Sequence, residues 1–352
     1  MSQITTASTA AISSAPTYCS SGDRMENTSC QTVSLDFPRQ FLPGFYSAVL
    51  IVGLMANGWG LKSLYYNWKT LRLINVFVFN LGIADMLYLL TLPFLVVYTA
   101  FGNDWIFGDD FCKVTRFCFN LNFYASIGFL TCISVYRYLA VVHPMKVRGR
   151  ITLTHSVGIS VVVWLLVSVQ SLPDMFYDKT TGNRAGKCYD TTSDFYIEDY
   201  LKYSLGWTLT GFCIPLLITL GCYGHVIVVL CRKTTTDKVL KQRSLTLLFI
   251  LILLFSACYI PYHIFKNFSL MTRVLYKQKI CHTWFNGVYI GHQISRGLVG
   301  LNSALNPLVY LHGNEDIPAQ LRQLLQRARQ MFSRPPSTNS VSVPMAQITE
   351  EV

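Results

Sequence analysis

The sequence contains seven long stretches of apolar residues, and these constrain the fold more than any other feature. A helix needs about 20 apolar residues to cross the hydrocarbon core of a bilayer. The stretches cover residues 41–66, 74–100, 111–142, 153–176, 201–230, 243–268 and 284–311. Polar residues interrupt the third and the seventh, and we interpret them as functional positions. The prediction is an all-α membrane protein, a bundle of seven transmembrane helices.

Composition excludes the usual soluble classes. Hydrophobic residues make up 51% of the chain and charged residues only 13%, whereas about 25% charged residues are typical of soluble proteins. The net charge of +11 does not indicate a nucleic-acid partner, because the basic residues recur between the apolar stretches. We also predict that the protein is not an enzyme, since HExxH, GxSxG and paired intramembrane Asp motifs are absent from the sequence.

The charged residues between the stretches predict the orientation. Lys and Arg dominate the connectors after the first, third and fifth stretches, and Asp is frequent in the alternate connectors. Cytoplasmic loops carry the excess of Lys and Arg. The N-terminus is therefore expected outside and the C-terminus in the cytoplasm of a multi-pass plasma-membrane protein. Its basic segments 146–150 and 232–243 would contact acidic lipid headgroups and a cytoplasmic partner.

Four regions follow from this topology. Residues 1–40 form an extracellular arm with a glycosylation sequon at Asn27. Residues 41–312 form the helical domain, 313–333 a short amphipathic cytoplasmic helix, and 334–352 a disordered tail. A second sequon, at Asn267, lies too near the membrane to be favoured.

Five of the 11 cysteines are expected on the outer side, where disulfides form: Cys19, Cys30, Cys112, Cys188 and Cys281. We predict that Cys112 pairs with Cys188. Cys281 would then pair with the N-terminal arm, through Cys30 in preference to Cys19, and one cysteine is left over.

Polar residues and prolines recur in a characteristic order along the stretches: Asn57, Asp85, Trp164, Pro215, Pro261 and the segment Asn306-Pro307-Leu308-Val309-Tyr310. In this respect residues 41–325 resemble the rhodopsin-like (class A) G-protein-coupled receptors. The resemblance implies that the protein is a receptor that activates a heterotrimeric G protein, with arrestin and receptor kinases as further partners.

Asp85 is the only acid that we place inside a stretch, and a lone carboxylate at membrane depth is costly unless it is neutralised, paired or bound to a cation. The resemblance implies an allosteric sodium ion, the one expected cofactor. It would be held by Asp85, Asn122, Ser126, Asn302 and Asn306. The alternative is a purely structural hydrogen-bond network.

At the cytoplasmic end, Tyr136-Arg137-Tyr138 replaces the acid-Arg-Tyr motif of that family. The resemblance implies that Arg137 projects toward the G protein, with Tyr223 and Tyr310 as its packing partners. The acid that would pair with Arg137 in the resting state is replaced by Tyr136. The resemblance also assigns the activation switch to Tyr259, where the family usually has Trp, and to hinges at Pro261 and Pro307.

Basic side chains gather at the outer ends of the third, sixth and seventh stretches, and no acid lies between Asp85 and Asp104 or between Lys238 and Asn314. Uncompensated buried cations repel one another, so this set predicts a site for a charge-dense anion such as a di- or triphosphate. Aromatic side chains would contact its base. The cations and their neighbours are Arg116, His263, Lys266, Arg273, Gln293 and Arg296, and the aromatic residues are Phe119, Tyr124, Tyr189 and Tyr289.

Four motifs narrow the resemblance to the metabotropic purinoceptors, within which the chain most resembles the ADP-activated type. They are Asp104-Trp105-Ile106-Phe107-Gly108-Asp109, Cys188-Tyr189-Asp190-Thr191-Thr192-Ser193-Asp194, the pair His263 and Lys266, and Gln293-Ile294-Ser295-Arg296-Gly297-Leu298. The resemblance implies a receptor for extracellular ADP or ATP that acts through phospholipase C and calcium. It adds Asp190 to the nucleotide contacts. It also implies a Tyr at position 292, where this sequence has His292.

Two other functions remain open. A receptor for a small dicarboxylate would share the pattern of His and basic residues. An organic-anion transporter would use the same cations but predicts inverted repeats, which are not visible in the sequence.

Overall fold

A computed structural model describes residues 17–19, 30–32, 36–66, 73–102, 104–147, 151–177, 188, 192–232, 246, 249–250, 252–280, 282–307 and 326. Met1–Gly313 form one unit and Asn314–Val352 a second, of which only Gln326 is described. The predicted glycosylation of Asn27 and the disordered tail lie outside the described residues, as does nearly all of the predicted cytoplasmic helix.

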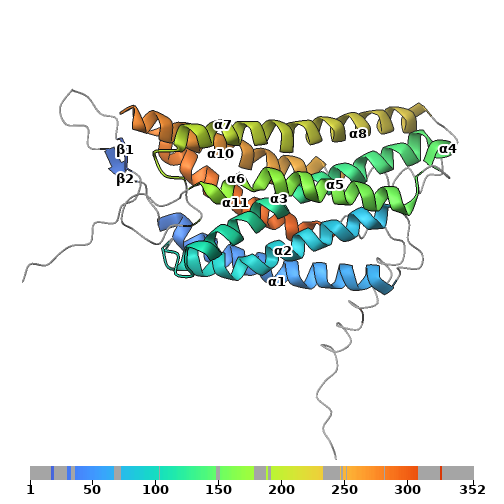
Figure 1. Ribbon diagram of the computed structural model, residues 1–352, viewed down its shortest axis with the longest axis horizontal. Helices are drawn as coiled ribbons and strands as arrows, with labels where there is room; N and C mark the ends of the chain where they lie inside the picture. The colour runs from blue at the N-terminus through green and yellow to red at the C-terminus, as the bar shows by residue number, and fades with distance from the viewer. Residues whose placement is uncertain are drawn as a thin grey trace, which may run out of the picture. The chain divides into compact units, whose positions relative to one another are not determined.

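Helices account for most of the described chain, and the long ones run side by side (Figure 1). They are α1 (Asp36–Tyr66), α2 (Ile74–Ala100), α3 (Asp109–Val142), α4 (Pro144–Val147), α5 (Leu153–Ser171), α6 (Pro173–Phe176), α7 (Ile197–Trp207), η2 (Thr208–Cys213), α8 (Ile214–Arg232), η3 (Phe255–Tyr259), α10 (Ile260–Lys277) and α11 (Trp284–Leu305). Two short strands, β1 (Thr17–Cys19) and β2 (Cys30–Thr32), pair antiparallel.

Helical segments cover the described parts of all seven predicted stretches, but several limits differ, and the fifth helix begins at Ile197 rather than at residue 201. The first helix begins at Asp36 rather than at residue 41, and the sixth continues to Lys277 rather than ending at 268. The extension of the sixth helix is amphipathic, because Leu270 and Thr272 are buried while Lys277 is exposed. A hydropathy window misses such a segment because its average is polar.

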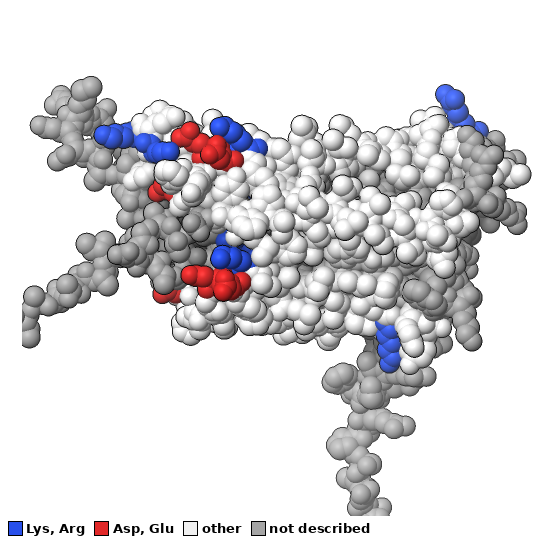
Figure 2. Space-filling view, viewed as in Figure 1, with Lys and Arg blue, Asp and Glu red and all other residues white. Residues whose placement is uncertain are grey.

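Five segments are long and apolar enough to cross a membrane: Gln40–Tyr66, Ile74–Ala100, Asp109–Val142, Leu153–Phe176 and Ile197–Arg232. The segment α10 carries three basic residues, and part of the sixth predicted stretch lies outside the described residues. In the space-filling view, the charged side chains of the described residues lie toward the two ends of the bundle and leave a broad uncharged band (Figure 2). Such a band suits the hydrocarbon core of a bilayer.

The bundle is closed by α11, the last long helix. It packs against α1 and α10, while α1 packs against α2, α2 against α3, and α3 against both α5 and α8. A glycine allows α11 and α2 to approach closely, because a Cβ at Gly300 would lie 2.5 Å from the Tyr88 hydroxyl oxygen. Tyr88 is fully buried at this contact, and Phe123 and Tyr259 are fully buried elsewhere in the bundle.

Two wide π turns lie just before prolines. The turn η2 precedes Pro215 and η3 precedes Pro261. Proline has no N–H to donate and its ring collides with the carbonyl of the preceding turn, and a π turn is one way in which a helix accommodates this. The sequence placed both prolines inside predicted helices and assigned a hinge to Pro261, but it did not indicate the π turns.

The polar residues that define the family resemblance join helices. Asn57 Nδ2 donates to the carbonyl oxygen of Ser303 at 2.8 Å and so joins α1 to α11. Trp164 Nε1 donates to Asn80 Oδ1 at 2.9 Å and joins α5 to α2. Since little apolar driving force acts between helices in lipid, such bonds help to fix how the helices pack.

Candidate functional site

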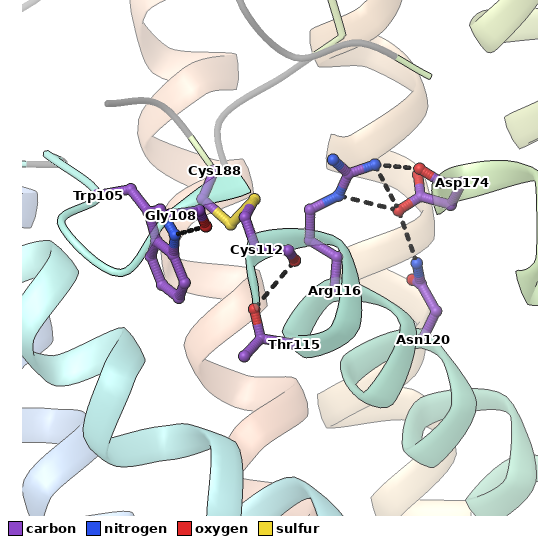
Figure 3. Close-up of a disulfide and its surroundings, with 8 residues drawn as sticks. All are labelled: Trp105, Gly108, Cys112, Thr115, Arg116, Asn120, Asp174 and Cys188. Atoms are coloured by element: carbon purple, nitrogen blue, oxygen red, sulfur yellow. Dashed lines mark hydrogen bonds and ion pairs between the residues drawn. A yellow bond between two sulfur atoms is a disulfide. The ribbon is translucent and has the colours of Figure 1, made fainter. Parts of the chain in front are cut away.

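A disulfide joins the start of α3 to the chain between α6 and α7, between Cys112 and Cys188 as predicted, at the end of the bundle that the sequence predicts to be the outer one (Figure 3). The predicted partner of the N-terminal arm, Cys281, lies outside the described residues. In the strand register Cys30 is opposite Cys19. The second predicted disulfide therefore stays a prediction.

Arg116 lies one turn below that disulfide and is not an uncompensated cation. Its Nη2 and Nε donate to Asp174 Oδ2 at 3.2 and 3.3 Å, and Nη2 also donates to the carbonyl oxygen of Asp174 (Figure 3). Arg116 is 5% exposed and Asp174 3% exposed. This corrects two expectations, because Arg116 has a carboxylate partner and Asp85 is not the only acid within a helical stretch.

The Asp174 carboxylate accepts further hydrogen bonds from two other residues. Asn120, one turn beyond Arg116 on α3, donates from Nδ2 to Oδ2 at 3.1 Å. Tyr200 on α7 donates from its hydroxyl to Oδ1 at 2.7 Å. Asp174 therefore holds the outer ends of α3, α6 and α7 together.

Arg273 is likewise compensated. At the outer end of α10 it donates to the Asp194 carboxylate and, at 3.1 Å, to the carbonyl oxygen of Thr192. One turn further on, Lys277 forms an ion pair with Glu198 at 3.2 Å. The sequence expectation failed for Arg116 and Arg273 for one reason. Their acids, Asp174 on α6 and Asp194 just before α7, are 58 and 79 residues away from them along the chain.

Lys266 differs from these two cations. No carboxylate of the described residues lies within ion-pair distance of its ammonium group, which is 5.7 Å from the ring centroid of Tyr262. The ring of Tyr262 in turn lies 5.9 Å from that of His292 on α11. Gln293 and Arg296 are buried on α11, and Tyr289 is buried against Phe285.

His263 is packed among helices. Its ring stacks on Phe212 at 4.3 Å and lies 5.4 Å from that of Phe123. Its Nδ1 is 3.1 Å from Thr208 Oγ1. Asn267 extends this network by donating to Thr208 Oγ1 and to the carbonyl oxygen of His263. The amide of Asn267 is thus already bonded, which agrees with setting its sequon aside.

The predicted aromatic contacts also have partners within the bundle. Phe119 lies 5.7 Å from Tyr88, ring to ring, and Tyr124 stacks on Trp207 at 4.0 Å. Tyr189 and Asp190 lie outside the described residues.

A second polar group lies in the middle of the bundle around Asp85, which is completely buried. Asn306 Nδ2 donates to both carboxylate oxygens, at 2.9 and 3.0 Å. Ser303, Asn122 and Ser126 lie within reach of the same carboxylate. The elements that meet here are α2, α3, α11, the chain just after α11 and, through Tyr259, the turn η3.

At the end of the bundle that the sequence predicts to be cytoplasmic, α3 and α8 come together. Arg137 is close enough to Tyr223 for its charge to act on the Tyr223 hydroxyl. Tyr138 lies 3.3 Å from His225, hydroxyl oxygen to Nδ1. The other expected partner, Tyr310, lies outside the described residues.

Comparison with known proteins decides the family. Residues 57–310 match the family described as 7 transmembrane receptor (rhodopsin family). The chain belongs to this family. Its seven predicted stretches are thus the seven helices of a receptor, which is a multi-pass protein of the plasma membrane and not an enzyme.

Curated relatives place the receptor among the purinoceptors. It is 38% identical to human purinoceptor 1 over 95% of its own length and 86% of the relative. It is 39% identical to purinoceptor 1 of Bos taurus over 88% of its own length and 83% of the relative. It is also 34% identical to 2-oxoglutarate receptor 1 of Rattus norvegicus over 80% of its own length and 83% of the relative.

The oxygen-rich group around Asp85 fits a sodium ion by its chemistry. Small hard cations prefer carboxylate, amide and hydroxyl oxygens. Among the described residues, no donor bonds to Oδ1 of Asn302 or to Oδ1 of Asn306, although both atoms are buried. These two acceptors and the carboxylate are the kind of ligands that a cation requires.

Several residues that organise the disulfide-bearing end of the receptor were not among the predicted site residues: Asn120, Asp174, Tyr200, Thr208, Tyr262 and Asn267. Tyr262 had a local signal, because it is four residues before Lys266 and shares its face of the helix. Asp174 had none, because its partner Arg116 is 58 residues away along the chain.

Proposed function

We propose that this receptor binds an extracellular nucleotide, ADP or ATP, and activates a heterotrimeric G protein, which then signals through phospholipase C and calcium. The observation that carries the proposal is its identity of 38–39%, over most of its length, with proteins named as purinoceptors. A cation on α10 without a carboxylate partner among the described residues supports it.

The proposed orientation has the N-terminus outside and the C-terminus in the cytoplasm. The disulfide between Cys112 and Cys188 supports this, because disulfides form in oxidising compartments. The start of α3 and the ends of α2 and α10 would then face the extracellular side.

In the proposed site, Lys266 and Arg296 supply the charges that meet the phosphates, and Gln293 supplies hydrogen bonds. Lys266 lies above Tyr262, and the ring of Tyr262 lies near His292 on the next helix, so a ligand held here would contact both α10 and α11. The ligand would favour the arrangement in which its contacts with both helices are tightest, with bending at Pro261 and Pro307.

At the cytoplasmic end, Arg137 and the basic segments 146–150 and 232–243 would contact the G protein and acidic headgroups. Arrestin and receptor kinases are proposed as further partners. A sodium ion at Asp85 would stabilise the resting arrangement and leave on activation.

A small dicarboxylate is the second candidate ligand, and one observation favours it. Asp174 and Asp194 compensate Arg116 and Arg273, which leaves fewer cations for the ligand than the sequence suggested. Lys266 and Arg296 would match two carboxylates. The identity of 34% with 2-oxoglutarate receptor 1 supports the same alternative.

The deciding experiment measures calcium release in cells that lack nucleotide responses of their own. ADP is expected to release calcium, whereas succinate and oxoglutarate are not. Arg296→Ala should abolish the response to ADP without lowering surface expression. The control is Lys202→Ala, which removes an outer cation whose side chain is 77% exposed and pairs with Asp199. An unchanged dose–response curve for Arg296→Ala would exclude this site.

A further inference from the structure

We propose that Asp174 is an internal counter-ion that keeps Arg116 out of the ligand site and thereby limits the negative charge of the ligand that the receptor prefers. The proposal rests on the anion-binding function proposed above. It assigns a specificity-determining role to a residue that does not contact the ligand.

The first step is that Arg116 already has hydrogen-bond partners. Two of its nitrogens, Nη2 and Nε, are directed at Asp174, and both residues are almost completely buried (Figure 3). Planar guanidinium–carboxylate pairing of this kind is strong and directional. An incoming phosphate would have to displace the carboxylate to reach Nε and Nη2, the two nitrogens that the pair occupies.

The second step is that Asp174 is itself held in place. Asn120 and Tyr200 donate to it from α3 and α7, so its carboxylate is fixed from two sides besides Arg116. Pro173 begins the short helix α6 and directs the chain there. A carboxylate fixed in this way competes with a ligand better than a flexible one, because no conformational entropy remains to be lost.

The third step is that Arg116 lies on the ligand side of α3. Phe123 is seven residues, or two turns, further along and therefore on the same face. Its ring lies 4.9 Å from that of Tyr262, over which Lys266 extends. Released from Asp174, Arg116 would be on the face of α3 that is directed toward Lys266.

The experiment compares AMP, ADP and ATP, which differ only in the number of phosphates, on cells that express the full chain. Asp174→Asn keeps the size of the side chain but removes the charge; its amide oxygen can still accept from Asn120, and its amide nitrogen can donate to the Tyr200 hydroxyl oxygen. We expect the ratio of ATP potency to ADP potency to rise by about tenfold, as one further charge-assisted hydrogen bond predicts. The control Asp199→Asn removes an exposed acid of α7 and should leave the ratio unchanged.

The double variant Asp174→Asn/Arg116→Gln separates specificity from stability. If the gain for ATP comes from a released Arg116, the double variant returns the ratio to that of the wild type. An unchanged ratio in Asp174→Asn, or a raised ratio that persists in the double variant, overturns the proposal. Arg116→Gln alone should leave the ratio unchanged, and a lowered ratio there also overturns it.

A ligand-free measurement keeps the test independent of the proposed function. Thermal unfolding of the purified receptor should show that Arg116→Gln and Asp174→Asn each lower the midpoint and that the double variant is no worse than either. Midpoints equal to that of the wild type for both single variants overturn the counter-ion role. A wild type that answers succinate rather than nucleotides refutes the proposed nucleotide ligand alone, and the ratio is then measured with succinate and citrate.

Discussion

Two buried carboxylates of this receptor have opposite surroundings. Asp174 is neutralised by a guanidinium group, whereas the partners of Asp85 among the described residues are neutral amides and hydroxyls. A buried ionised carboxylate without a compensating cation is costly. Asp85 is therefore the position in the membrane-spanning part where a bound cation would contribute most.

Sodium dependence should disappear when the Asp85 charge is removed. In the wild type, replacing choline chloride by sodium chloride at constant ionic strength is expected to lower agonist affinity by about fivefold, a typical coupling between two sites. Asp85→Asn should show the same affinity in both salts, measured by radioligand competition. Asp174→Asn, which removes a buried acid elsewhere, should keep the dependence. Retained sodium dependence in Asp85→Asn would contradict the proposed ion site.

The sequence predicted the surroundings of Asp85 far better than those of Arg116. Asp85, Asn122 and Asn306 belong to motifs that occur at fixed places on their helices, so family resemblance located them together. The partner of Arg116 depends on how the end of α5 and α6 approaches α3. That approach is a tertiary property, and the local pattern around Asp174 contains no trace of it.

At the scale of elements, the contact between α7–η2 and α10 is unusually polar. Ser204 donates to Asn267 Oδ1 at 2.8 Å, and Asn267 Nδ2 donates to Thr208 Oγ1 at 2.8 Å. With His263, these side chains join the fifth and sixth helices just beside the π turn η2. The sequence marked His263 as a ligand contact, and the structure shows that its ring also belongs to this junction.

Truncating the central residue of this junction should loosen it. Asn267→Ala removes three hydrogen bonds and is expected to lower the free energy of unfolding by about 1–2 kcal/mol, the upper range for hydrogen bonds between membrane helices. The measurement is thermal unfolding of the ligand-free receptor in detergent. Ser256→Ala, which removes one exposed intrahelical bond, should change it by less than about 0.5 kcal/mol. Equal decreases in the free energy of unfolding for the two variants would show that the junction does not stabilise the receptor.

At the scale of the whole molecule, five described helices are long and apolar enough to be recognised as membrane spans by themselves. The seven-helix architecture could be predicted from hydropathy together with the family motifs, because the bilayer imposes the length of each helix. The ends of the helices could not. The extension of α10 to Lys277 depends on packing against α7 and on ion pairs with Glu198 of α7 and with Asp194 just before that helix. These contacts exist only once the bundle has formed.

The disulfide should matter for the outer end as a whole. It joins cysteines that are 76 residues apart along the chain, and native disulfides of secreted domains typically contribute about 2–5 kcal/mol. Cys112→Ser and Cys188→Ser are each expected to reduce surface expression and ligand response, and the double variant should be no worse than either. Cys118→Ser, a free cysteine on the same helix, is the control. Additive losses in the double variant would argue against the pairing.

The π turn η3 has a consequence for comparing this receptor with its relatives. A π turn holds one more residue than an α turn, so side chains beyond it are rotated by about 100° around the helix axis. Lys266 and Arg273 lie beyond η3, and their direction around the bundle therefore depends on whether that extra residue is accommodated. A helical wheel drawn straight through the sixth helix would assign these two cations to the wrong side.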